Sequence, residues 1–150
     1  MAERLDPQHN QVYEAEDAAF AAERKAGEQS LAELQAWSDQ IVSANWFQAR
    51  WQLLQVAVLD GRGSRHARAH LRGLQMPKRC RYPYYVVHEL THWVDRTGGE
   101  DHGAVFCGLY LHFVRRVYGW HRAEVLAKEF RKRGVVWDRW VRRYGQLVHG

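Results

Sequence analysis

The feature that most constrains this chain is the pentapeptide His88-Glu89-Leu90-Thr91-His92. Residues four apart on a helix lie on one face, with their Cβ atoms about 5–6 Å apart. A helix here would let His88 and His92 direct ring nitrogens at one ion about 2.0–2.1 Å from each. Glu89 would lie beside that ion, where a carboxylate can take a proton from a metal-activated water. The spacing therefore predicts a metal-binding helix with an adjacent catalytic carboxylate.

The surrounding residues favour a buried helix. Pro83 is suited to the first turn of a helix, and Thr97-Gly98-Gly99 is suited to its end, because glycine readily adopts left-handed geometry. The apolar surface between these points comes from Val86, Leu90, Trp93 and Val94. Two imidazoles and a carboxylate are costly to bury unless something satisfies them. A metal ion does so, and the alternative is a pair of core histidines satisfied by hydrogen bonds.

A catalytic zinc needs a third protein ligand and an open position for water. His102 ranks first, because glycines that allow the chain to reverse precede it and an apolar, helix-like segment follows it. Glu100 and Asp101 are nearby oxygen ligands, and Glu124 or Glu129 would serve in a glutamate-type site. Asp101 is more naturally the cap of the next helix, or a partner that orients a histidine.

These residues resemble a known arrangement. His88–Trp93 followed by His102–Phe106 is similar to the HELxH…HG..F pattern of SprT-like and WLM-type metallopeptidases. More of the chain resembles an uncharacterised family of zinc metallohydrolases from actinobacteria, through residues 11–17, 60–63 and 134–136.

The resemblance implies a zincin-like fold, Zn²⁺ on His88, His92 and His102, and Glu89 as the catalytic carboxylate. It implies a reaction class but no particular substrate. The segment Lys78-Arg79-Cys80-Arg81 departs from the family's usual pattern because it is unusually basic.

The remaining chain predicts one α+β domain over residues 1–150, mostly helical, with a small β-hairpin before the motif helix. Residues 1–10 are expected to form a loose lead-in. Helices are expected over 11–26, 30–45, about 106–118 and 122–133, and a short helix is expected in the tail from 135 to 150. The hairpin would pair residues 55–59 with 65–71 around the turn Asp60–Ser64.

Charge is unevenly distributed along the chain. Residues 1–40 hold nine acidic and three basic side chains, whereas residues 111–150 hold three acidic and ten basic ones. Such asymmetry can mark nucleic-acid contact, here through Arg139, Arg142 and Arg143 beside aromatic residues. It can equally mean that an acidic N-terminal helix packs against a basic C-terminal one.

Location and cysteine chemistry follow from simple features. The sequence predicts neither a membrane-spanning helix nor a secretory signal. The two cysteines make no disulfide framework, so a cytoplasmic protein is expected. Cys107 is expected in the core, and Cys80 is an alternative metal ligand that ranks below an ordinary thiol.

Three functions compete on this basis. The first is a zinc metallopeptidase acting on a peptide or protein, in which Glu89 is the general base for a zinc-activated water. The second is a nucleic-acid-associated protease similar to SprT-like proteins. The third is a non-catalytic protein with a structural zinc closed by four ligands. The sequence does not rank the candidates for an oxyanion partner, which are Tyr84, Tyr85, Tyr110, His70 and His112, and it gives no oligomeric state.

Overall fold

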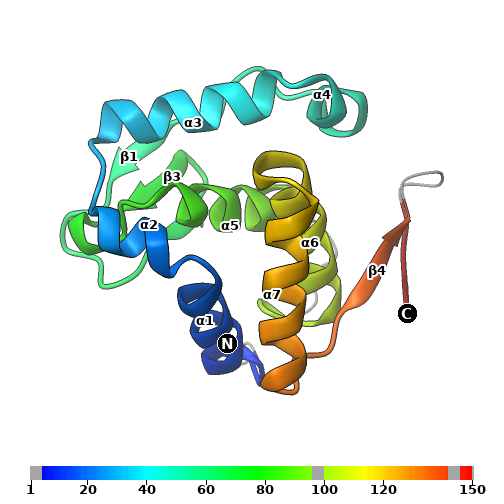
Figure 1. Cartoon of the computed structure of the whole chain (residues 1–150). Coiled ribbons are helices and arrows are strands. Elements are labelled where there is room, and N and C mark those ends of the chain that lie inside the picture. Colours follow the sequence, from blue (N-terminus) through cyan, green and yellow to red (C-terminus); the bar gives the residue numbers. More distant parts are fainter. Residues whose placement is uncertain (1–4, 96–99, 142–145, 150) are drawn as a thin grey trace. The chain divides into compact units, whose positions relative to one another are not determined.

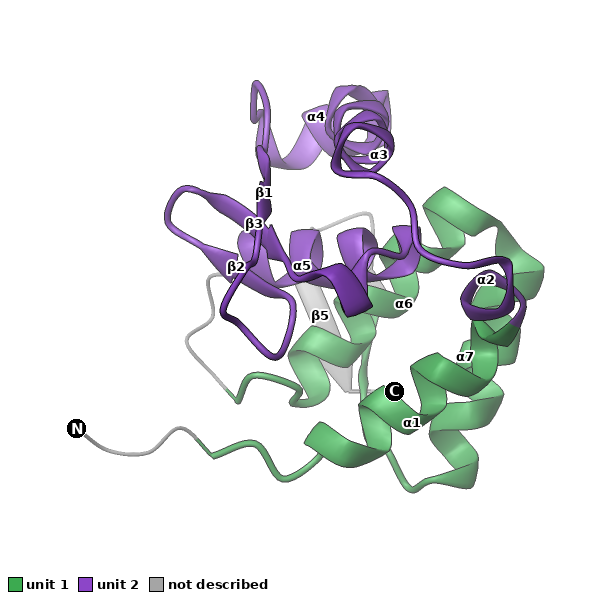
Figure 2. Ribbon diagram, turned by 90° about the vertical axis from the view of Figure 1, so that its left-hand side faces the viewer, with its two compact units in different colours: residues 1–21, 95–150 green, residues 22–94 purple. Residues whose placement is uncertain are grey.

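The computed structural model describes residues 5–95, 100–141 and 146–149. Its described helices and small sheets confirm the expected α+β class (Figure 1). In the described part of the chain, no helix has the length and apolarity needed to cross a membrane. The chain divides into two compact units, which Figure 2 colours green (unit 1, residues 1–21 and 95–150) and purple (unit 2, residues 22–94).

Unit 2 carries the motif helix and a three-stranded sheet. Its elements in chain order are most of α2 (Ala21–Ala26), α3 (Leu31–Ser43), α4 (Asn45–Trp51), β1 (Val58–Asp60), β2 (Arg68–His70), β3 (Gly73–Met76), a 3₁₀ turn η1 (Lys78–Cys80) and α5 (Pro83–Val94). The helix expected over 30–45 begins with a capping box at α3: the Glu33 backbone N–H donates to Ser30 Oγ at 3.1 Å, and the Ser30 N–H donates to Glu33 Oε2 at 2.9 Å. Figure 1 shows α3 lying along the strands and α5, against which it packs.

The sheet differs from the predicted hairpin. Its strand order is β1-β3-β2, with β1 parallel and β2 antiparallel to the central strand β3. The prediction that residues 55–59 pair directly with 65–71 is therefore wrong, and the antiparallel hairpin is β2–β3. Leu74 and Met76 explain why β3 is central, because both side chains are fully buried.

Glycine permits the close approach at the start of β3. Gly73 has φ +150°, and a Cβ on it would lie 2.3 Å from the Ala57 carbonyl oxygen. The Leu74 backbone N–H donates to the same oxygen at 2.8 Å, so the chain must run close to Ala57 at this point.

Unit 1 is helical, with a hairpin at its end. It contains α1 (His9–Ala19), α6 (Ala104–Tyr118), α7 (Trp120–Lys132), β4 (Asp138–Val141) and β5 (Gln146–His149). In Figure 1, α1 and α6 lie alongside α7, and both pack against it. The helix ends expected near residues 118 and 133 are confirmed: Gly119 at φ +97° follows α6, and Gly134 at φ +69° lies just beyond α7. Arg133 Nε lies 3.8 Å from Glu14 Oε2, so an acidic N-terminal helix does pack against a basic later one.

Two sequence predictions about unit 1 and its border are wrong. The helix expected over 11–26 is interrupted at Phe20, which separates α1 from α2. Beyond this break, α2 buries none of its residues.

The expected terminal helix is also wrong, because β4 and β5 pair as an antiparallel hairpin. Aromatic and β-branched residues such as Trp140 and Val141 favour strand over helix. Arg142, Arg143 and Tyr144 lie outside the described residues.

A buried carboxylate ties α1 to α6 inside unit 1. Glu16 is fully buried, and the Tyr110 hydroxyl donates to its Oε1 at 2.6 Å. A buried carboxylate that loses a hydrogen bond is left poorly solvated.

We expect Tyr110→Phe to lower the free energy of unfolding by about 1–3 kcal/mol, since the carboxylate loses this donor. Chemical denaturation measures the change. Tyr82→Phe is the matched control, because no hydrogen bond of the Tyr82 hydroxyl is found among the described residues. Equal effects of the two substitutions would contradict the assignment.

Candidate metal centre

The histidine pair lies on α5, as the spacing predicts. The rings of His88 and His92 stand one helical turn apart, with centroids 5.0 Å apart and planes tilted by 57°. His88 is fully buried and His92 is half-buried. The helix begins at Pro83, as expected, and buries ten of its twelve residues. The turn expected at Thr97–Gly99 lies outside the described residues.

Glu89 is held beside this pair. Its side chain is 2% exposed, and its Oε1 lies 3.9 Å from His88 Nε2. That distance is too long for an ordinary hydrogen bond between these two atoms.

His102 directly precedes α6 in unit 1 and is 4% exposed. Its Nδ1 lies 2.8 Å from Asp6 Oδ2. The Gln8 side-chain amide donates to the His102 carbonyl at 2.9 Å, which fixes the backbone as well as the ring. The Cys107 thiol also donates to this carbonyl, at 3.4 Å.

The partners of His102 differ from those expected. Gly103 is the N-cap of α6 and no side chain caps this helix, so the capping role predicted for Asp101 is wrong. Asp6, which lies in the segment expected to be a loose lead-in, contacts the His102 ring through its carboxylate. Asp6, Gln8 and His9 all make defined contacts in unit 1.

Asp6 also contacts a second histidine. His9 Nδ1 lies 3.0 Å from the same Oδ2 atom. Partial burial raises the pKa of the Asp6 carboxyl, but hydrogen bonds and charge attraction from His102 and His9 outweigh this and lower the pKa overall. Asp6 is therefore held ionised, and an ionised carboxylate can only accept hydrogen bonds.

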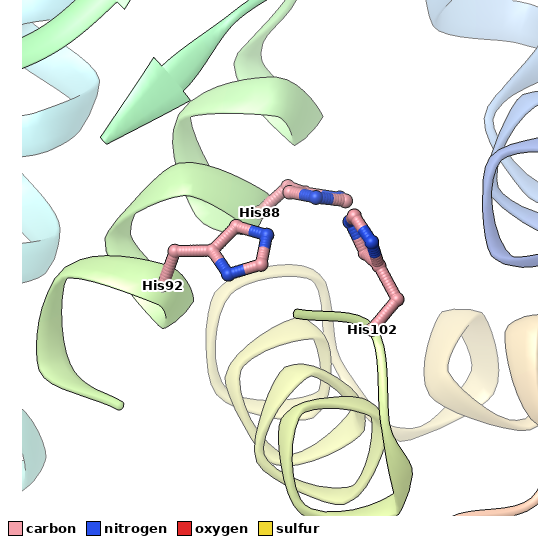
Figure 3. A group of neighbouring side chains, drawn as sticks. All are labelled: His88, His92 and His102. Carbon is pink, nitrogen blue, oxygen red and sulfur yellow. The ribbon is translucent and has the colours of Figure 1, made fainter. Parts of the chain in front are cut away.

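The three predicted ligands form one group. His88, His92 and His102 each offer a ring nitrogen, and these atoms lie within 4.8 Å of one another (Figure 3). Four sequence alternatives appear in no such group among the described residues: Glu100, Asp101, Glu124 and Cys80. Glu129 is also absent from these groups, and its carboxylate contacts Arg133 and Lys132 instead.

The donor set fits zinc. Imidazole nitrogens are common zinc ligands, and on a tetrahedral ion with bonds of about 2.0–2.1 Å they stand roughly 3.3 Å apart. Structural zinc sites are normally closed by four protein ligands, whereas catalytic sites have three and an open position. The described group has three members.

Comparisons with protein-family models, with curated proteins and with solved structures each return no match.

The two thiols are buried and free. Burial raises the pKa of both the Cys80 and the Cys107 thiol, which keeps them protonated near neutral pH. A protonated thiol is a poor nucleophile and a poor metal ligand. The expectation that Cys107 belongs to the core is confirmed.

The five candidates for an oxyanion partner lie in different surroundings in the structure. The Tyr110 hydroxyl is engaged with Glu16, and Arg24 donates to the Tyr84 hydroxyl at 3.0 Å. Tyr85 lies on α5 with its ring centroid 6.3 Å from that of His88. His70 lies on β2 and His112 on α6.

Proposed function

We propose that this chain is a zinc-dependent metallohydrolase with a zincin-like fold, and that its substrate is a peptide or protein. His88, His92 and His102 would hold Zn²⁺, and Glu89 would act as general base. The observation that carries the proposal is the grouping of three imidazoles with a buried carboxylate 3.9 Å from one of them.

Zinc in such a site lowers the pKa of water toward about 7 and polarises a carbonyl group. The residues of the chain then have distinct tasks. Glu89 would accept the water proton and deliver it to the leaving amine. Burial of Glu89 and His88 keeps bulk water away, which strengthens the electrostatic interactions in the site.

The sheet supports a peptide as substrate. β2 is an edge strand, because the order β1-β3-β2 leaves one side of it unpaired. It packs against α5, the helix that carries His88 and His92. An exposed edge can bind an extended peptide through main-chain hydrogen bonds. β2 would then hold a substrate alongside the metal-binding helix.

The experiment is hydrolysis of a broad peptide library by the zinc-loaded chain, with a chelated sample beside it. We expect cleavage that depends on zinc and is restored when zinc is returned. A zinc-loaded chain that leaves the library intact would remove the peptidase assignment.

A second function, binding of single-stranded nucleic acid, is favoured by a pocket within unit 1. The pocket has a volume of about 460 Å³ and lies among α6, α7 and β4. Arg115, Arg131 and Arg139 line it together with Trp120, which is 62% exposed. Bases stack on exposed aromatic rings, and arginines contact the phosphates. The carboxylates of Glu124 and Asp138, which also line the pocket, would repel an anionic ligand.

If the pocket binds nucleic acid, a labelled oligothymidine should bind at low salt and be released as salt rises. Trp120→Ala should weaken binding about 5–150-fold, the loss of one stacked base. Fluorescence anisotropy measures this. Trp37→Ala in unit 2 is the control. Absence of binding at low salt would exclude the function.

A further inference from the structure

We propose that Asp6 is a positioning residue for the metal centre: its carboxylate accepts the Nδ1 proton of His102 and so leaves the Nε2 lone pair of that ring for zinc. This inference deepens the proposed function and rests on it. It gives a role to the N-terminal segment, which lies outside the histidine motif.

The hydrogen bond selects one tautomer of His102. A carboxylate oxygen accepts hydrogen bonds, so the Nδ1 atom of His102, 2.8 Å from Asp6 Oδ2, donates to it. A neutral imidazole protonated at Nδ1 has its lone pair on Nε2. Metal-binding histidines commonly donate their second ring nitrogen to a carboxylate in this way, which fixes the ring and raises its basicity.

The ring is also fixed by its neighbours inside unit 1. The His102 centroid lies 5.2 Å from that of Tyr13 and 5.1 Å from that of Phe106, both in edge-to-face arrangements. Gln8 holds the His102 carbonyl. With packing on two sides and a hydrogen bond on a third, the ring has little freedom to rotate away from Asp6.

A second cation among Asp6, His9 and His102 is the competing explanation, because these three also have ligand atoms within 4.8 Å of one another. The distances favour hydrogen bonds. Asp6 Oδ2 lies 2.8 Å and 3.0 Å from the two Nδ1 atoms, whereas ligands of one tetrahedral ion stand roughly 3.3 Å apart. One oxygen that accepts two N–H groups accounts for this geometry. Asp6 Oδ1 is buried and has no hydrogen-bond partner, so zinc stoichiometry must decide whether a second ion binds there.

The experiment combines zinc titration with nitrogen NMR of the histidine rings, using the full chain. Asp6→Ala should weaken zinc binding about 10–100-fold. In the zinc-free variant, His102 should lose its preference for the Nδ1-protonated tautomer, which a merely structural role would not require. Asp6→Asn keeps the shape and an acceptor oxygen, so we expect a smaller loss, and it serves if the alanine variant fails to fold. Glu14→Ala is the control, since this acidic side chain is 67% exposed.

Unchanged zinc affinity and an unchanged His102 tautomer in Asp6→Ala would overturn the inference, while the three-histidine site would stand. Binding of two zinc ions, with the second lost in His9→Ala, would make Asp6 a ligand and also overturn it. Failure of the proposed function looks different: the wild-type chain would bind no zinc. The tautomer measurement on the zinc-free chain still tests the hydrogen bond in that case.

Discussion

Replacing Glu89 with glutamine is expected to leave zinc bound and to lower peptide hydrolysis by about 10²–10⁴-fold, the usual contribution of a general base. Glutamine keeps the size of the side chain but cannot accept the water proton. Glu89 lies 3.9 Å from His88 Nε2 and is not itself among the grouped metal ligands, so metal affinity should change little.

The measurement is kcat on a peptide cleaved by the wild-type chain, together with the zinc content of both proteins. Glu28→Gln is the matched control, because Glu28 is exposed in unit 2. Loss of zinc from Glu89→Gln would make Glu89 a ligand. Retention of full activity would exclude it as the base.

Zinc is expected to raise the thermal stability of the chain, and His88→Ala should abolish that rise. An ion that binds only the folded chain stabilises it by about 2.7 kcal/mol when free ion is present at a hundredfold excess over Kd. The comparison is the melting temperature with zinc and with chelator, for each protein separately. Because each protein is compared with itself, the loss of stability caused by the cavity that His88→Ala leaves on the buried helix drops out of the difference.

His66→Ala is the control for this prediction, since His66 is exposed in unit 2. It should retain the full zinc-dependent shift. A shift that persists in His88→Ala would place the ion elsewhere.

Local signals predicted much of the structure. Pro83, the spacing of His88 and His92, and the Ser30–Glu33 capping box each act within one or two helical turns, so the sequence displays them directly. Gly119 ends a helix for the same local reason.

Long-range pairing was not predicted. β3 contains only four residues, and its central place depends on partners from two other segments, Val58–Asp60 and Arg68–His70. A short apolar strand shows no periodicity that identifies its neighbours. The helix predicted for residues 135–150 is wrong for a related reason. A mixture of tryptophan and arginine suits either an amphipathic helix or a strand.

Asp6 shows the limit most clearly. It lies 96 residues before His102, the ring that it contacts, in a polar stretch with no motif. A partner so distant along the chain leaves no local pattern from which the contact could be predicted. The burial of Glu16 could not be predicted either, because hydrophobic patterning places a charged residue of an alanine-rich helix at the surface.

The central claim is that one divalent ion binds through His88, His92 and His102. Titration of the purified, metal-free chain with zinc, monitored by calorimetry, tests it most directly, with His102→Ala titrated in parallel. The account predicts one zinc per wild-type chain and a large loss of affinity in the variant. Equal affinity and stoichiometry in the two proteins would contradict it.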